Sequence, residues 1–426
     1  MPIDDNSRSR RRFVKAATGT IAVGTLAGCI GGDEGDGDGN GGGGGGGGDD
    51  GGAVAVPGIY DESGATSDVG RPTAIGSRDA IAYFNENDLL SRDIDHPNND
   101  YAYEVSQAQQ LYDQYTSGSD PPMIIGWGTD DTETLSGSIA QDEIVYVSAA
   151  YAANLMTEDS PYNFFGNLDY TSQARAHLKW IADNDAEATV AFIFSNTAFG
   201  KSPVEGGKQY AEELELDVAE DINLPLTANS ATTQLRQARD ADVDYLIHQN
   251  TAAPMQVLLS DKADVYPDVT VCGLTYTVDE PRVQESPENF EGVRYVNAFR
   301  TFQGALDSDG EGAEMIRANF EREGRDLEDP SVANLNYVRG CIHAVLALRG
   351  LGNAIDAGRD PTSGADVRES MFGIEDDDML GLAEPFTYTE DDRRPTMTGR
   401  LFEVSDGSLA FDEAVELPRR EDWIGL

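Results

Sequence analysis

The strongest constraint on the fold of this chain is a long alternation of short apolar runs with amphipathic segments, which begins near residue 53. Several of these runs, such as residues 190–194, are apolar without interruption, as in parallel strands buried on both faces. The runs predicted as strands are 53–60, 101–105, 123–127, 144–148, 189–194, 218–222, 243–249, 269–273 and 293–299. Such an alternation predicts an α/β protein built from doubly wound parallel sheets.

Helix signals lie between the predicted strands. Ser202-Pro203-Val204-Glu205 has the pattern of a capping box with proline at the first helical position. Thr171 is a candidate N-cap for a second helix. A longer apolar stripe comprises Val332, Leu335, Val338, Ile342, Val345 and Leu346 ahead of Gly350. The 374 residues from 53 to 426 exceed the usual size of one such sheet, so two lobes are expected.

The charge of the chain excludes some partners. It has 77 acidic and 30 basic side chains, and its formal net charge is −47. A surface this acidic repels phosphate backbones and anionic membranes, so nucleic-acid binding is not expected. With 39% hydrophobic residues the chain can still form a sizeable core. In molar salt the Debye length falls to about 3 Å, so the acidity is interpreted as an adaptation to a concentrated saline medium.

The N-terminal 52 residues read as an export and anchoring segment. Arg10-Arg11-Arg12-Phe13, followed by a short apolar stretch to Leu26, resembles a twin-arginine signal peptide, predicted over 1–28. A frayed N-terminal helix is the structural alternative. Residues 26–29 (Leu-Ala-Gly-Cys) resemble a lipobox, which predicts lipidation of Cys29. Residues 29–52, rich in Gly and Asp, then form a flexible tether.

Signatures of catalysis are absent from the sequence. It contains no Gly-x-Ser-x-Gly elbow and no phosphate-binding loop. Cys272 and Cys341 are interpreted as small hydrophobic residues rather than a disulfide. The four histidines are far apart in the sequence and are interpreted as satisfied structural residues: His96, His177, His248 and His343. No enzyme activity, cofactor or metal ion is therefore expected.

A series of short motifs points to a known family. In order, they are Ser63-Gly64-Ala65, Gly70, residues 80–87, Tyr112, Tyr115, residues 124–126, residues 147–150, residues 191–194, Phe199-Gly200, residues 388–394 and residues 401–404. Their order and spacing resemble the leucine/isoleucine/valine-type solute-binding proteins of ABC transporters, over the chain from about residue 53 to the C-terminus. Arg393 stands where that family usually has histidine.

The resemblance implies a type I periplasmic-binding fold, in which two Rossmann-like lobes are joined by a hinge of three crossovers. Lobe one would comprise residues 53–170 and 298–395, and lobe two residues 171–297 and 396–426. A small molecule would bind between the lobes, which close on it, and the permease subunits of an ABC importer would accept it. Lipid on Cys29 would anchor the protein to the outer face of the cell membrane.

The resemblance also implies a set of ligand contacts. They are Ser63, Trp127, Thr129, Asp130, Ser148, Ala149, Tyr151, Phe199, Asn250, Thr251, Thr275 and Tyr276. Trp127 is alternatively a core residue, and Ser148 a cap of the following segment. Tyr151→Ala is expected to abolish binding without changing the melting temperature of the ligand-free protein, whereas a large destabilisation would make Tyr151 a core residue.

The sequence departs from amino-acid binders at one position. Those proteins generally place an acidic residue just after the strand predicted here at 269–273, where it pairs the ligand ammonium. Here Thr275 and Tyr276 follow that strand, and Asp279 lies further on. Either Asp130 or Asp279 supplies the charge, or the ligand lacks an amine and is an aromatic acid, an amide or another small apolar compound.

Two other functions remain open at this stage. A sensory receptor domain of the same fold would be expected to continue into a hydrophobic segment and a signalling module, and neither occurs in the 426 residues. An extracellular hydrolase on a lipid anchor is disfavoured by the missing nucleophile motifs. Binding of a solute without its turnover would separate a binding protein from a hydrolase.

Overall fold

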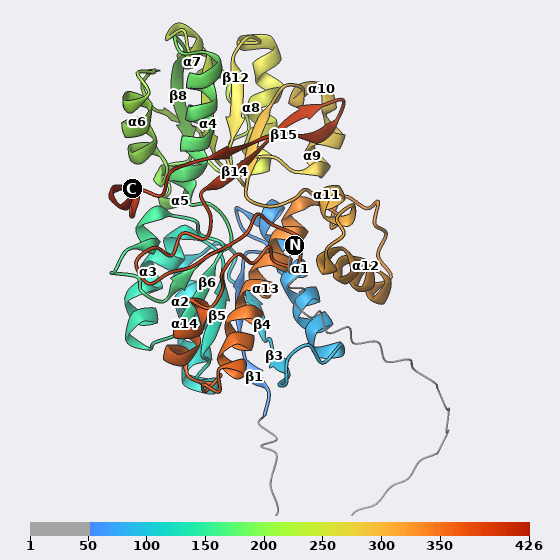
Figure 1. The fold of residues 1–426 in the computed structure, drawn as a ribbon. Coiled ribbons are helices and arrows are strands. Elements are labelled where there is room, and N and C mark those ends of the chain that lie inside the picture. Colours follow the sequence, from blue (N-terminus) through green and yellow to red (C-terminus); the bar gives the residue numbers. More distant parts are fainter. Residues whose placement is uncertain (1–51) are drawn as a thin grey trace, which may run out of the picture. The chain divides into compact units, whose positions relative to one another are not determined.

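The computed structural model describes residues 52–426, so the predicted signal peptide, Cys29 and nearly all of the predicted tether lie outside the described residues. Two separate sheets organise the described chain, and helices pack against both (Figure 1). All strand pairs of the first sheet, and all but the last two pairs of the second, are parallel. The predicted class of two doubly wound α/β lobes is confirmed.

The first sheet has five strands in the order β4-β2-β5-β6-β7. These are β2 (Gly58–Tyr60), β4 (Asn98–Asp100), β5 (Met123–Gly126), β6 (Val145–Ser148) and β7 (Asn163–Phe164), while β1 (Val54–Ala55) and β3 (Ile94–Asp95) form a pair of their own. The helices of this part are α1 (Ser67–Glu86), α2 (Val105–Ser119), α3 (Thr129–Gln141), the 3-10 helix η1 (Ala153–Met156), α11 (Phe302–Leu306), α12 (Glu311–Glu323), α13 (Leu335–Asp356) and α14 (Gly364–Met371).

The second sheet has eight strands in the order β10-β8-β11-β12-β13-β14-β15, with β9 paired to β8. They are β8 (Thr189–Phe194), β9 (Asp217–Val218), β10 (Ile222–Asn223), β11 (Tyr245–Gln249), β12 (Thr270–Gly273), β13 (Arg294–Asn297), β14 (Thr398–Ser405) and β15 (Ser408–Glu416). The helices of this part are α4 (Tyr170–Asn184), α5 (Ala198–Lys201), α6 (Val204–Glu213), α7 (Thr232–Asp240), α8 (Ala252–Val265), α9 (Glu280–Glu285), α10 (Pro287–Phe290) and the 3-10 helix η2 (Glu421–Trp423).

The chain passes three times between the two sheets: after β7, after β13 and before β14. Side-chain amides join the first two passages. The Asn167 amide nitrogen donates to Asn297 Oδ1 at 2.8 Å and to Thr275 Oγ1 at 3.0 Å, and Asn167 Oδ1 accepts the Ala298 N–H at 3.0 Å. Because these groups are buried, their mutual hydrogen bonds hold the two crossing strands in register.

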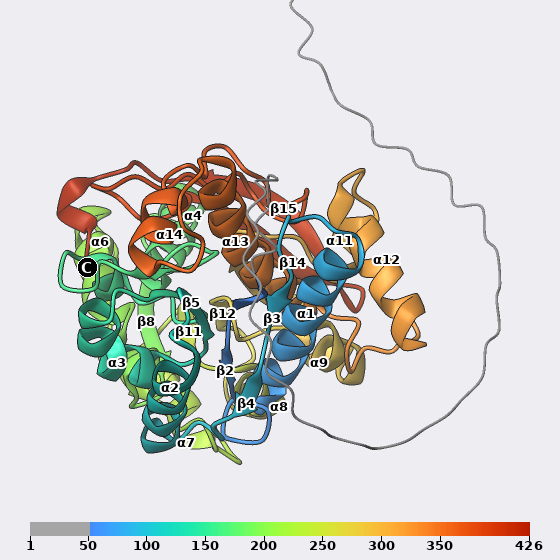
Figure 2. The same ribbon diagram turned by 90° about the horizontal axis from the view of Figure 1, so that it is seen from below.

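The helices α1 and α13 lie side by side along the first sheet (Figures 1 and 2). Their backbones approach so closely that a Cβ on Gly76 would lie 2.1 Å from the Tyr337 carbonyl oxygen, and one on Gly340 would lie 1.9 Å from the Thr73 carbonyl oxygen. The Ser77 hydroxyl donates to the Gly340 carbonyl at 2.9 Å. The crossing therefore requires glycine at both positions.

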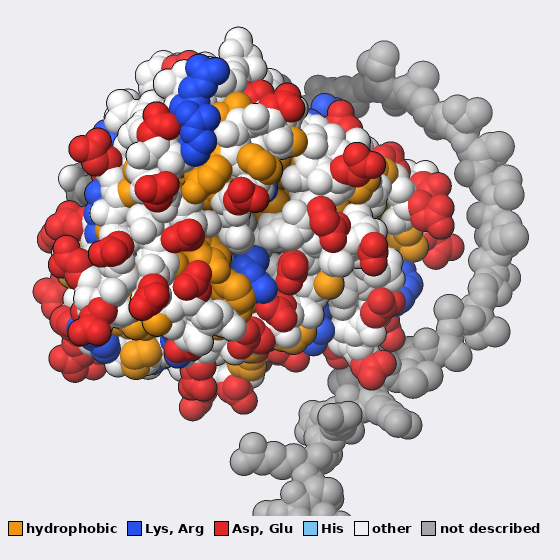
Figure 3. Space-filling view, turned by 90° about the horizontal axis from the view of Figure 1, so that it is seen from above, with side chains coloured by type: hydrophobic (Ala, Val, Ile, Leu, Met, Phe, Trp, Pro, Cys, Tyr) orange, Lys and Arg blue, Asp and Glu red, His pale blue; other side chains and the backbone are white. Residues whose placement is uncertain are grey.

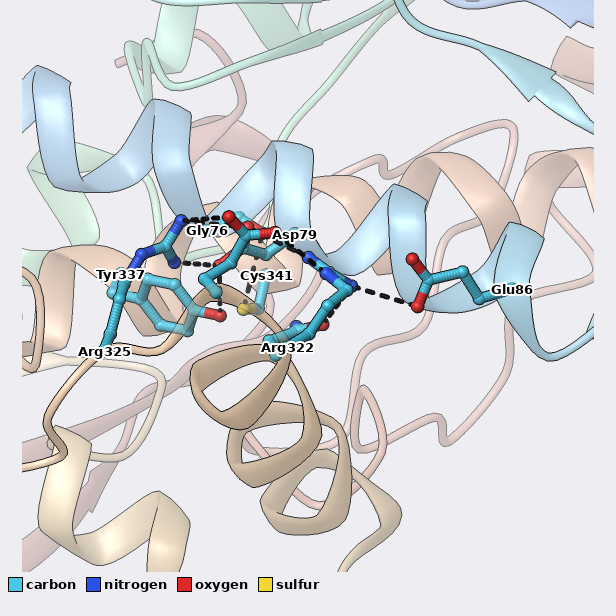
Figure 4. A network of polar contacts seen from close by, with 9 residues as sticks. Gly76, Asp79, Glu86, Arg322, Arg325, Tyr337 and Cys341 are labelled. Carbon is cyan, nitrogen blue, oxygen red and sulfur yellow. Dashed lines mark hydrogen bonds and ion pairs between the residues drawn. The ribbon is translucent and has the colours of Figure 1, made fainter.

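A buried carboxylate attaches α12 to this helix pair (Figure 4). Asp79 of α1 is 4% exposed and forms ion pairs with Arg322 at 3.2 Å and with Arg325. The Tyr337 hydroxyl of α13 donates to Asp79 Oδ2 at 2.9 Å. At the solvent end of the same group, Arg322 lies 3.5 Å from Glu86, which is 55% exposed. Asp79 thus joins α1 to α12 and α13, which lie far from α1 in sequence.

The strand predicted at Tyr101–Val105 is wrong. The strand β4 ends at Asp100, and α2 begins at Val105. Between them Ala102 and Tyr103 have φ of +53° and +58°, a left-handed conformation that lies outside the strand region. The predicted strand at 218–222 is also divided, into the two-residue strands β9 and β10.

Both predicted N-caps are also wrong. The helix α6 begins at Val204 after Pro203, and no side chain caps it, so Ser202 and Glu205 form no capping box. The cap of α4 is Asp169, whose carboxylate accepts the Ser172 N–H at 2.7 Å. Thr171 is buried inside the first turn of that helix. An ionised aspartate at the cap also interacts favourably with the helix dipole, which the hydroxyl of threonine does not.

The predicted structural residues are buried in the core, except His96, which is half-buried. Cys272 and Cys341 are free thiols, and His177 and His343 each form one hydrogen bond, to Gly273 O and to Tyr151. His96 bonds to the Val56 carbonyl. His248 differs from the prediction, because neither ring nitrogen has a partner among the described residues, and burial lowers its pKa to about 3. It is therefore a neutral core residue.

The acidic side chains are dispersed over the protein surface. Figure 3 shows carboxylates across the whole face seen from above, with few Lys or Arg side chains between them. On this face the carboxylates do not gather into a docking patch. The interpretation of the acidity as an adaptation to a saline medium stays a prediction. Within residues 52–426, no helix is both long and apolar enough to cross a membrane.

Candidate ligand-binding site

A small cavity lies where the carboxyl ends of strands from both sheets converge. The loops after β5 and β6 form its first-sheet side, and the loops after β11 and β12 form the opposite side. This is the position at which doubly wound sheets bind ligands. The lining residues are Thr66, Val69, Tyr103, Trp127, Gly128, Thr129, Ala149, Tyr170, Phe199, Thr251 and Tyr276.

Five of the eleven lining residues are aromatic, and Tyr276 lies at their centre. Its ring centroid is 5.6 Å from that of Trp127, 5.8 Å from that of Phe199 and 6.3 Å from that of Tyr170, all in edge-to-face geometry. The Tyr276 hydroxyl donates to the Ala149 carbonyl at 2.6 Å. Because Trp127 and Ala149 follow strands of the first sheet and Tyr276 follows a strand of the second, these contacts join the two sides of the cleft.

The cavity also contains three threonine hydroxyls, which differ in their partners. The Thr66 hydroxyl donates to Asp61 Oδ2 at 2.7 Å and accepts from the Trp127 indole N–H at 2.8 Å. The hydroxyls of Thr129 and Thr251 have no hydrogen-bond partner in the described part of the chain, although each residue is only 1% exposed. A buried hydroxyl without a partner is costly, so both are available to a ligand.

Each of these free hydroxyls lies at the N-terminus of a helix. Thr129 is the first residue of α3, and Thr251 is the N-cap of α8, whose side chain makes no capping hydrogen bond. Because α3 follows β5 and α8 follows β11, one hydroxyl comes from each side of the cleft. The positive ends of the two helix dipoles therefore face the cavity and favour electron-rich ligand atoms.

Six of the twelve residues predicted as ligand contacts line this cavity: Trp127, Thr129, Ala149, Phe199, Thr251 and Tyr276. Trp127 also shows the core role considered as its alternative, whereas Ser148 does not cap the following 3-10 helix, whose N-cap is Ala152. The Trp127 indole is hydrogen-bonded to Thr66, and the Ser148 hydroxyl donates to the Ala150 carbonyl at 3.1 Å. Their part in ligand binding remains a prediction.

Four other predicted contacts lie outside the cavity wall, with their polar atoms bound to protein. Ser63 is exposed and donates to Asp100 Oδ2 at 2.5 Å. The Asn250 amide donates to the Leu224 carbonyl at 2.9 Å. Thr275 donates to Asn297 Oδ1 at 3.0 Å and is part of the hinge. These partners satisfy the groups without a ligand.

The fourth predicted contact outside the cavity wall is Tyr151, which is fully buried behind that wall. Its hydroxyl bonds to His343 Nε2 at 2.8 Å, and its ring stacks on Tyr276 with centroids 5.7 Å apart. The Phe165 and Tyr170 rings are each 5.5 Å away. Tyr151 therefore supports the aromatic wall from the core side.

Two aspartates on the first-sheet side reach across the cleft beside the cavity. Asp68 Oδ2 accepts the Ala253 N–H in the first turn of α8 at 3.0 Å, and burial raises the pKa of Asp68. Asp130 Oδ1 accepts the Ala198 N–H of α5 at 3.4 Å. In each carboxylate the second oxygen has no partner among the described residues, and neither aspartate lines the cavity.

The acidic residues after β12 serve the protein itself. Asp279 caps α9 by accepting the Arg282 N–H at 3.0 Å, and burial raises its pKa to about 7. Glu280 accepts the Phe302 N–H at 3.0 Å and the Leu335 N–H at 2.8 Å. Asp279 is thus placed outside the cavity, and the alternative in which it pairs a ligand ammonium has no support from the geometry.

Sequence reasoning missed five lining residues: Thr66, Val69, Tyr103, Gly128 and Tyr170. Gly128 belongs to the predicted loop of Trp127 and Thr129, and Thr66 follows the Ser-Gly motif, so both had a signal. Tyr103 had no such signal, because its position in the cavity wall depends on the left-handed turn at Ala102. Within residues 52–426 there is no group of three or more His, Cys, Asp or Glu side chains that can hold a metal ion.

Comparison with known proteins gives a consistent result. The family model described as periplasmic binding protein matches residues 53–408. A substrate-binding protein of an ABC transporter from Aeropyrum pernix is 27% identical, with a TM-score of 0.80 over 88% of this chain and 98% of that chain. No curated protein matches the chain in sequence.

Two more distant solved structures share the fold. A branched-chain amino acid ABC transporter protein from Thermus thermophilus, with bound valine, is 20% identical with a TM-score of 0.79, covering 86% of this chain and 97% of that one. A solute-binding protein from R. palustris in complex with benzoate is 16% identical with a TM-score of 0.73, covering 88% of this chain and 99% of that one.

Proposed function

The chain belongs to the periplasmic binding protein family, and we propose from this premise that it captures a small organic solute between its two lobes and delivers it to an ABC permease. The observation that carries the proposal is the cavity, to which each side of the cleft contributes one buried hydroxyl without a partner. A solute that bonds to both hydroxyls stabilises the closed arrangement. Members of a binding-protein family bind a solute without transforming it, and this protein does the same.

The lobes are assigned to residues 53–170 with 298–395 and to residues 171–297 with 396–426. In support, every strand of the first sheet falls in the first set and every strand of the second sheet in the other. The hydrogen bond between Asn167 and Asn297 joins two of the three crossing segments. Such a bond suits a hinge whose segments stay together while the lobes move. Closure would create the surface that a permease recognises.

Export and anchoring are proposed from the N-terminal sequence. The arginine pair, the apolar stretch to Leu26 and the lipobox around Cys29 predict a mature protein that begins with a lipidated cysteine outside the cell. Since one acyl chain binds a membrane reversibly, firm attachment requires a second chain or a partner. Partition of the full-length protein into a detergent phase tests this: Cys29→Ser should move it to the aqueous phase, whereas unchanged partition would refute the anchor.

The proposed function is tested by a thermal-shift screen in molar salt against amino acids, aromatic acids, amides and short peptides. A true ligand should stabilise the protein by about 2.7 kcal/mol at a hundredfold excess over its Kd. The solute should be recovered chemically unchanged. If no small solute in a broad library raises the melting temperature, the proposal is refuted.

A further inference from the structure

We propose that Asp68 and Asp130 are two latches that hold the cleft closed through bonds between protein groups alone, so that its two sides join whether or not a solute is bound. The shape of the ligand-free protein is a property beyond the proposed function. Three observations support the latches: the positions of the two aspartates, the groups that they bind, and the oxygen that each leaves without a partner.

The two aspartates occupy equivalent positions on the first-sheet side of the cleft. Asp68 is the second residue of α1, and Asp130 is the second residue of α3. Asp68 Oδ2 accepts the N–H of Ala253, the second residue of α8, at 3.0 Å. Asp130 Oδ1 accepts the N–H of Ala198, the first residue of α5, at 3.4 Å. Bonds of the same kind therefore join α1 to α8 and α3 to α5 across the cleft.

The charge of Asp68 makes its latch the stronger of the two. The helices α1 and α8 have 20 and 14 residues, and the positive N-terminal ends of both lie at this carboxylate. Two such ends repel each other, whereas a negative charge between them attracts both. An ionised acceptor also forms a stronger hydrogen bond with an N–H than a neutral one does. The bond of Asp130 is longer, and α5 has only four residues, so the second latch is weaker.

Each latch is only half satisfied, which makes it reversible. Asp68 Oδ1 and Asp130 Oδ2 are buried and have no hydrogen-bond partner within residues 52–426. A carboxylate oxygen buried in this way has lost its hydration without receiving a hydrogen bond in exchange. Opening of the cleft returns that hydration while it breaks the bond to the N–H. Because the two effects oppose each other, the closed and open shapes differ little in free energy.

The latches flank the cavity without belonging to its wall. Neither aspartate lines the cavity, so the latches act on closure and not through contact with a solute. Lining residues nevertheless lie within two positions of all four latch residues in the sequence: Val69, Thr129, Phe199 and Thr251. Release of the latches therefore separates the two sides of the cavity itself.

Amide hydrogen exchange of the full chain, without solute and in molar salt, tests each latch by its effect on the other. Asp68→Ala removes the first latch and should speed exchange of the Ala198 N–H at least about tenfold, because a hydrogen bond to a charged group that favoured closure is lost. Ala198→Pro removes the donor of the second latch and should speed exchange of the Ala253 N–H by a smaller factor. Proline suits the first helical position, and Thr197 before it is already extended, with φ of −120° and ψ of 168°.

Glu311→Ala is the matched control. Glu311 is an exposed acidic residue in the first turn of α12, and within the described chain none of its hydrogen bonds or ion pairs crosses the cleft. This variant should leave exchange at Ala198 and Ala253 unchanged. Exchange in the buried helix α13 should be the same as in the unaltered protein for all three variants.

The results that would overturn the latches are distinct from a failure to bind solute. If Asp68→Ala leaves exchange at Ala198 unchanged, Asp68 forms only a local bond and does not hold the cleft. If exchange in α13 rises as well, the variant unfolds, and Asp68→Asn decides. Asn keeps an acceptor for the Ala253 N–H, so it should give a smaller rise at Ala198 and none in α13. A rise in α13 there too, or no rise at Ala198, refutes the proposal, and the proposed function stands in every case because no solute is used.

Discussion

Replacement of Asp79 by asparagine should destabilise the protein far more than neutralisation of Glu86, the other carboxylate in the group shown in Figure 4. Asn keeps the shape of the side chain and an acceptor for the Tyr337 hydroxyl, but it removes the charge that Arg322 and Arg325 share. Loss of the charge from a buried pair costs about 3–5 kcal/mol. Because the two arginine side chains are 22% and 25% exposed and regain some hydration, we expect the lower part of that range, about 3 kcal/mol.

The matched control lies in the same group. Glu86 is 55% exposed and 3.5 Å from Arg322, so Glu86→Gln should cost about 0–1 kcal/mol. Unfolding by urea is suitable, since guanidinium would change the ionic strength. Hydrogen exchange should also accelerate in α12 for Asp79→Asn and not for Glu86→Gln. Equal unfolding free energies for the two variants would show that Asp79 does not hold α12 to α1 and α13.

Three further predictions concern stability. Tyr151→Ala should lower the unfolding free energy by about 3–5 kcal/mol because the ring is fully buried, in contrast to the expectation from sequence. An unchanged melting temperature would instead show that Tyr151 is a residue of the cavity wall. Burial raises the pKa of Asp131 and of Asp279 to about 7, above the unfolded value of about 3.9. The stability that these two carboxyls contribute is therefore complete below pH 4 and is lost as the pH rises to about 7. Asp279→Asn, which retains an N-cap acceptor, should therefore show a smaller fall in melting temperature between pH 5 and 8, and an equal fall would contradict the assignment. Dialysis to low salt should loosen the fold reversibly because a net charge of −47 is then unscreened, and a scattering radius that does not change would refute the halophilic interpretation.

The fold was predictable where one local pattern is sufficient. Residues 189–194 form β8 as predicted, because an uninterrupted apolar run has few alternatives to a strand buried on both faces. β7 has two residues and leaves no periodic signal. β15 exposes most of its side chains, so its sequence lacks the apolar pattern of a core strand. The N-cap of α4 was misplaced by two residues, since Asp169 and Thr171 are both suitable caps.

The site was predictable where residues follow a strand directly. Trp127, Thr129 and Thr251 come immediately after strands whose carboxyl ends must converge, so their meeting at the cleft follows from topology. The place of Tyr151 depends on His343, which is 192 residues away in sequence and gives no local signal. The sequence could not predict which cavity hydroxyls lack a hydrogen-bond partner, because the partners are supplied by tertiary packing.

The contacts that close the cleft also govern how fast a solute can enter and leave. Thr129 and Thr251 are each 1% exposed, in a cleft whose two sides are joined by the bonds of Asp68 to Ala253 and of Tyr276 to Ala149. Entry therefore waits for these bonds to break, and the association rate should level off at high solute concentration, at the rate of spontaneous opening. The same barrier slows escape, so a captured solute stays with the protein until the cleft opens, and a permease that accepts the solute must trigger that opening.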